Sequence, residues 1–160
     1  MTGDTEIKRK ADELASCADA IQFADPDFRR EMSRWADQGP FGTPWLLAKL
    51  AQLSLSYLHQ GNRVAKKDCE LLMRAPVFAM ICSKDNDRLS QVKVGQVFER
   101  IYLTATALDI RLQPLSQMTE LPEIRAELAS LIAESDMVPQ QPFRLGYAEA
   151  EAERTPRRPL

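Results

Sequence analysis

The N-terminal part of the chain has apolar positions at helical spacing. Between Thr5 and Phe23 these positions recur every three or four residues, which predicts a helix with one apolar face, formed by Ile7, Ala11, Leu14, Ala18 and Ile21. Asp25 followed by Pro26 is typical of an N-cap and first helical position, so a second helix is predicted to start there and to end before Gly39. A third is predicted from Trp45 to about His59, and residues 1–4 are expected to be frayed.

The pattern changes at Pro76. The run from Val77 to Cys82 is continuously apolar, which predicts a strand covered on both faces. From Ser90 to Ile110 apolar residues surround the helical wheel almost completely, which is typical of a buried helix. Glycine within that helix lowers its stability by about 1 kcal/mol. We therefore expect Gly95 to permit close packing against another element.

Two further strands are expected near the end of the chain. Residues 110–115 read as a strand that Pro114 confines to a sheet edge or a strand end. A helix with Pro122 in its first turn follows, and after a break at Pro139 the last strand is predicted at residues 143–148. The predicted fold class is α+β, mostly helical, with a small sheet and a buried central helix at about residues 90–110.

Composition is that of one ordinary globular domain. The chain has 160 residues, of which 44% are hydrophobic and 28% charged, and a net charge of −2. A charge this close to zero, with basic residues scattered among acidic ones, argues against a general nucleic-acid surface. Three cysteines without a CxxC spacing indicate reduced thiols. No signal peptide and no apolar stretch long enough for a membrane span is visible, so we expect a cytoplasmic protein.

Most enzyme signatures are missing: the sequence has no GxGxxG, P-loop, HExxH or GxSxG motif. The single histidine, His59, is more typical of a helix C-terminus than of catalysis. Asp85 and Asp87 have the spacing of possible metal ligands, but such a pair in a polar turn is usually solvated. No metal site is predicted. Trp35 and Trp45 fit core positions better than ligand stacking.

Two segments have residues suited to a ligand. Residues 113–117, Gln-Pro-Leu-Ser-Gln, follow the predicted second strand and present hydrogen-bonding groups to a flat ligand, or they form a plain strand-to-helix turn. Arg157 and Arg158 stand between prolines, where paired guanidiniums suit a phosphate. The alternative for this pair is a solvated C-terminal tail.

These segments belong to an ordered set that resembles the nitroreductase family. The set comprises PVFAMI at 76–81, VGQVFERIYLTATA at 94–107, RLQPLSQ at 111–117, FRLGY at 143–147 and TPRRPL at 155–160. In order and spacing the likeness runs from about Asp27 to Leu160, and it is nearest to the branch whose members end in GY…TPRRPL. Any one piece is weak, whereas the ordered set is fairly specific.

The resemblance implies a homodimer that binds FMN at its subunit interface. Such proteins pass hydride from NAD(P)H through the flavin to a nitro-aromatic, quinone or similar small aromatic acceptor, so no side chain is expected to act as acid or base. Pro114, Leu115 and Ser116 correspond to the segment lying against the flavin ring. Arg157 and Arg158 correspond to the basic positions that hold the FMN phosphate.

One part of the family pattern is not found. Relatives begin with an arginine-rich segment at the start of a helix, and the basic pairs Arg9-Lys10 and Arg29-Arg30 stand in a different context. Residues 1–160 therefore read as one nitroreductase-like domain, resembling the C-terminal half of the family and incomplete on its N-terminal side, with an extended tail at 149–160. This leaves a second interpretation open: a truncated or degenerate flavin-free relative that serves as a binding or dimerisation module.

Overall fold

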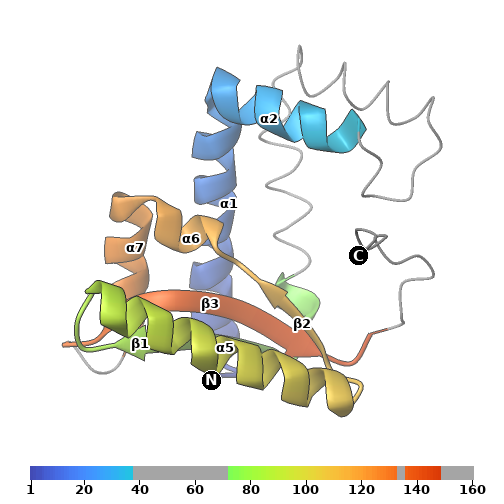
Figure 1. Ribbon diagram of the computed structural model, residues 1–160, viewed down its shortest axis with the longest axis vertical. Coiled ribbons are helices and arrows are strands. Elements are labelled where there is room, and N and C mark those ends of the chain that lie inside the picture. The colour runs from blue at the N-terminus through green and yellow to red at the C-terminus, as the bar shows by residue number, and fades with distance from the viewer. Residues whose placement is uncertain (38–71, 133–135, 149–160) are drawn as a thin grey trace, which may run out of the picture.

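The computed structural model describes residues 1–37, 72–132 and 136–148, without the side chains of residues 35–37 (Figure 1). Over these ranges the fold is α+β and mostly helical with a small sheet, as the sequence predicts, and the sheet is antiparallel. The helices are α1 (Thr5–Ala24), α2 (Pro26–Asp37), α5 (Arg88–Ala107), α6 (Gln117–Glu120) and α7 (Pro122–Ala129). The strands are β1 (Val77–Ser83), β2 (Arg111–Pro114) and β3 (Val138–Gly146).

The first two helices begin as their sequences predict. The Asp4 carboxylate accepts from the backbone N–H groups of Glu6 (2.8 Å) and Ile7 (3.1 Å), which caps α1. The Asp25 carboxylate accepts from the N–H of Asp27 (2.8 Å) at the start of α2. The N-terminal residues differ from the expectation of fraying, because Thr2 forms an antiparallel bridge with Phe78 at the outer edge of β1.

The sheet has the order β1-β3-β2, and both pairings are antiparallel. The prediction that Pro114 confines its strand to an edge is confirmed, since β2 pairs only with β3 among the described strands. β3 begins earlier than predicted: Pro139 does not break the chain but lies inside the strand, as does Pro142.

Prolines are tolerated in β3 because β2 pairs only with Phe143 to Gly146. On the side away from β1, the earlier residues of β3 face no described strand. The carbonyl of Pro142 accepts from Leu115 on that side, 2.9 Å away, so the proline nitrogen also points away from β1. A register shift between Ile81 and Cys82 accommodates Pro139 opposite Cys82.

The two faces of the sheet are covered by different helices. α5 lies across one face, while α1, α6 and α7 lie behind the other (Figure 1). On the α5 face, Phe143 packs edge-on against Phe98, with ring centroids 5.6 Å apart. On the opposite face Phe78 joins the main core, whose other buried members are Ala11, Ala15, Ala18, Leu72, Leu115, Met118, Ile124 and Leu128.

The central helix is not buried in the single chain, contrary to the prediction from its apolar composition. Within α5 only Ala105 is buried. Several large apolar residues of the helix are exposed to solvent instead: Leu89 (61%), Val92 (54%), Val97 (45%), Tyr102 (44%) and Leu103 (62%). Gly95 is likewise not at a close contact, because a Cβ built there meets nothing within 4 Å. One stripe of α5 therefore faces the sheet, and the opposite side faces outward.

Gly146 is the glycine for which the structure supplies a packing reason. A Cβ built on it would lie 2.5 Å from Cδ and 2.7 Å from Cγ of Pro76, the residue before β1. We expect Gly146→Ala to lower the free energy of unfolding by about 1–3 kcal/mol, because the proline ring has no room to move without shifting its backbone. Urea denaturation midpoints measure the change.

The matched control is Gly95→Ala, which adds the same methyl group in open space. It is expected to raise the free energy of unfolding by about 1 kcal/mol through helix propensity alone. Equal effects of the two substitutions would contradict the packing argument.

Candidate functional site

The segment predicted to contact a ligand begins where α5 ends. Asp109 adopts a left-handed conformation (φ 56°), and the N–H of Ile110 donates to the carbonyl of Ala105 at 2.8 Å. The N–H of Asp109 donates to Thr106 at 3.1 Å, which completes a Schellman motif. This cap turns the chain back along the sheet, so that β2 starts at Arg111 directly beside the end of the helix.

Leu115 anchors the segment 114–116 to the core and to β3. Its side chain is only 7% exposed and belongs to the core cluster, and its N–H donates to Pro142. The carbonyl of the following Ser116 accepts from both the N–H and the hydroxyl of Thr119, at 2.9 and 3.0 Å, which forms the single turn of α6. The position of residues 114–116 is therefore set by a core anchor on one side and a helix start on the other.

The three predicted ring-contacting residues offer different groups. Pro114 is exposed and presents an apolar ring without an N–H. Ser116 is half-buried, and its hydroxyl lies 3.5 Å from Nε2 of Gln141. Leu115 points into the core, so its side chain does not reach the surface. The observed contacts are those of a strand-to-helix turn, and a ligand role for the segment stays a prediction.

A guanidinium next to this segment was not singled out from the sequence. Arg144 on β3 stands opposite Gln113 on β2, and Nε of Arg144 donates to Oε1 of Gln113 at 2.9 Å. A second nitrogen, Nη2, donates to the same oxygen. The pairing depends on strand register, which the sequence of either strand does not specify. Because successive strand residues point to opposite faces, the Gln113–Arg144 pair lies on one face of the sheet and Pro114, which pairs with Phe143, lies on the other.

The other half of the predicted site lies outside the described residues. Arg157 and Arg158 belong to the segment 149–160, for which the structure gives no description, as do His59 and Trp45 in 38–71 and the side chain of Trp35. The phosphate-binding role of the arginine pair therefore stays a prediction.

A separate polar cluster surrounds the turn before α5. The Arg125 guanidinium donates to the carbonyl of Pro139 (2.8 Å), to Oε1 of Gln140 (3.0 Å) and to Oδ1 of Asn86 (3.1 Å). Nε2 of Gln140 also donates to the Ser83 hydroxyl at 2.8 Å. These bonds join α7, the start of β3 and the β1–α5 turn, and each is explained by holding that turn in place.

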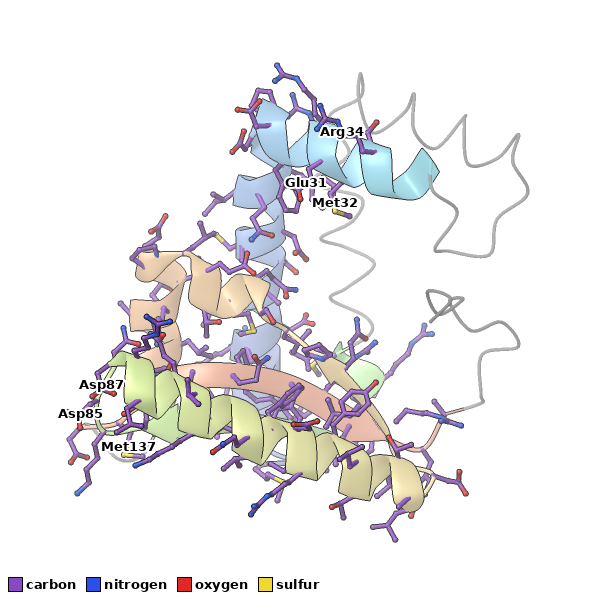
Figure 2. All side chains as sticks on the ribbon, viewed as in Figure 1. Glu31, Met32, Arg34, Asp85, Asp87 and Met137 are labelled. Atoms are coloured by element: carbon purple, nitrogen blue, oxygen red, sulfur yellow. The ribbon has the colours of Figure 1, made fainter. Side chains whose placement is uncertain are left out.

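Next to this cluster in the chain, Asp87 is the N-cap of α5 (Figure 2). Its carboxylate accepts from the backbone N–H of Ser90 at 2.7 Å. That hydrogen bond is the main cause that holds the pKa of Asp87 below its ordinary value, because it stabilises the ionised form. The Asp85-x-Asp87 spacing thus reflects a helix cap: among the described residues, no three His, Cys, Asp or Glu side chains gather as a metal site would require.

Comparisons with known proteins add no identification: no family model matches the chain, and no significant match is found among curated proteins or solved structures. In the described parts of the chain, no helix combines the length and the apolar character needed to cross a membrane.

The Asp87 cap should make the stability of the protein depend on pH. Because the folded-state pKa is lowered, the contribution of the ionised cap is present above the unfolded-state pKa and is lost as the pH falls through the folded-state pKa. We expect Asp87→Asn, which keeps an N-cap acceptor that does not titrate, to remove this part of the acid destabilisation. Urea midpoints of both proteins across the acid range provide the measurement, and parallel curves would contradict the assignment.

Proposed function

We propose that this chain is a nitroreductase-like, FMN-dependent oxidoreductase that acts as a homodimer. Its reaction is hydride transfer from NAD(P)H to a nitro-aromatic, quinone or similar acceptor. The observation that supports the proposal most is that two segments of the resemblance, 111–117 and 143–147, lie side by side. The nearest ends of the two segments, residues 117 and 143, are 26 positions apart (143 minus 117) in the sequence. The segments nevertheless pair as β2 and β3, with Leu112 opposite Leu145.

The groups along this edge fit a flat heteroaromatic ring with polar edges. Exposed Pro114 offers an apolar contact surface, and the half-buried Ser116 hydroxyl offers a hydrogen-bonding atom. In the proposal, residues 114–116 lie against the ring, with Leu115 anchoring the segment in the core. Arg157 and Arg158 hold the phosphate through charge-assisted hydrogen bonds.

Bound FMN would supply the redox chemistry, which protein side chains lack. The chain's own residues then have to orient the ring and restrict water. An edge fixed by β-sheet pairing and by a buried leucine is suited to orientation, because its backbone has little freedom to shift.

A second candidate is a flavin-free dimerisation module. The exposed apolar side of α5 favours it, since such a surface serves association whether or not a cofactor is bound. The two candidates differ in one property, namely binding of FMN.

Titration of the purified protein with FMN separates them. The oxidoreductase proposal expects a shift of the flavin absorbance bands, quenching or enhancement of flavin fluorescence, and an FMN-dependent rise in Tm. NAD(P)H oxidation with a quinone acceptor should then depend on added FMN. If FMN causes neither a spectral change nor thermal stabilisation, and calorimetry detects no binding, the flavin-free module is the correct candidate.

The terminal arginines have their own test. Arg157→Ala combined with Arg158→Ala should weaken FMN binding by about 3 kcal/mol, roughly a hundredfold in Kd, because two charged donors to the phosphate are lost. Isothermal titration measures the affinity.

The control removes two exposed arginines elsewhere, Arg9→Ala with Arg30→Ala, so that the net charge changes equally. That variant should bind FMN as the unaltered protein does. If the terminal variant also binds unchanged, the pair belongs to a solvated tail.

A further inference from the structure

A carboxamide on β3 lies beside the predicted ring-contacting segment. Nε2 of Gln141 donates to the carbonyl of Pro142 at 3.0 Å and to the hydroxyl of Ser116 at 3.5 Å. The same Pro142 carbonyl accepts from the N–H of Leu115 at 2.9 Å, and that bond ties the segment to β3. Gln141 therefore contacts residues 114–116 at the point where they are attached to the sheet.

The strand register places Gln141 on the same face of the sheet as Pro114. Phe143 lies opposite Pro114, and Gln141 precedes Phe143 by two positions on β3, so the three side chains share one face. The Gln113–Arg144 pair belongs to the other face. A half-buried carboxamide and an exposed proline ring therefore stand on one face of the sheet where β2 ends.

The contacts of Gln141 determine which end of its carboxamide is available. A carbonyl oxygen can only accept, so the nitrogen of the carboxamide must face Pro142 and the oxygen must point elsewhere. Nε2 has two hydrogens, and the Pro142 carbonyl and the Ser116 hydroxyl are the two acceptors that it contacts. Oε1 accepts no hydrogen bond from any described residue. The side chain thus has an acceptor left for a ligand.

Ser116 supplies the complementary group. Its hydroxyl accepts from Gln141, so the hydroxyl hydrogen is left to donate, and no described residue accepts it. An acceptor oxygen next to a donating hydroxyl matches a ligand in which an N–H stands beside a carbonyl. The imide edge of a flavin ring has this order, with N3–H beside the C4 carbonyl.

We propose that Gln141 is a specificity-determining residue of the ring site. Its Oε1 accepts from the N3–H of the flavin, and its Nε2 orients the Ser116 hydroxyl, which donates to the neighbouring C4 carbonyl. The proposal rests on the proposed function, because it requires a flavin against residues 114–116. It restricts the site to rings with a free imide N–H, since a ring without this group leaves Oε1 buried and unpaired.

The first measurement compares FMN with N3-methyl-FMN by isothermal titration to the unaltered protein. The methyl group removes the N–H and leaves the phosphate and the remaining ring edge unchanged. FMN should bind about tenfold more tightly, which is the net effect of one neutral hydrogen bond. Equal affinities for the two ligands would overturn the proposal.

A variant then separates the hydrogen bond from the bulk of the methyl group. Gln141→Met keeps the approximate volume of the side chain but has no amide, so it should bind both ligands equally, at about the affinity of the unaltered protein for N3-methyl-FMN. A general loosening of the site would weaken both ligands alike and keep their ratio. If the variant still prefers FMN by about tenfold, the preference arises elsewhere and the role of Gln141 is rejected.

Gln140→Met is the matched control. This neighbouring carboxamide lies on the opposite face of β3, where it donates to the Ser83 hydroxyl at 2.8 Å and accepts from Arg125 at 3.0 Å. Loss of these bonds should lower Tm, while the preference for FMN over N3-methyl-FMN stays that of the unaltered protein. Loss of the preference here as well would show that it follows stability rather than contact, which would overturn the proposal.

The FMN titration of the unaltered protein distinguishes the two proposals. Absence of FMN binding rejects the flavin-dependent function, and the role of Gln141 with it. FMN binding without a preference over N3-methyl-FMN rejects the role of Gln141 alone.

Discussion

The antiparallel pairing of β3 with both of its neighbours is the constraint on which the described fold depends. Among the described strands β3 is the one with a partner on each side, β1 and β2, and it comes last along the chain, so this sheet is incomplete until residues 138–146 are in place. The same strand carries Phe143 against Phe98 of α5 on one face and Arg144 beside Phe78 and Gln113 on the other. Both helical layers are thus positioned by one strand with long-range contacts.

Local signals in the sequence predicted the elements whose cause is local. α1 follows from apolar periodicity, the start of α2 follows from the Asp25 cap, and the edge position of β2 follows from Pro114. The prediction for α5 was correct in position and wrong in burial, since an apolar stripe does not reveal whether its partner is another part of the chain or another molecule. Pro139 was wrongly predicted to break the strand. A proline is accommodated at that position of β3 because β2 is too short to pair with it, and the sequence around Pro139 does not show this.

In the candidate site, too, the sequence predicted what has a local cause and missed what depends on tertiary contacts. The sequence placed Pro114, Leu115 and Ser116 around the end of a strand, and in the structure β2 ends at Pro114. It did not show that Leu115 is buried in the core, nor that Arg144 lies across from Gln113, because both depend on register and on packing against α6 and α1. A local sequence pattern can indicate that a segment is suited to contact a ligand. Which of its side chains are accessible is determined by the tertiary contacts.

The Arg125 cluster has a consequence for how the molecule opens. One guanidinium holds α7, the start of β3 and the turn before α5 through three hydrogen bonds, so none of these segments separates without breaking the bonds of the others. We expect them to form one cooperative unit in native-state hydrogen exchange, with the amides of the first turn of α5 protected as long as β3 stays paired. Fluctuations at the end of α5 beside β2, about 30 Å along the helix, would then be free to occur separately.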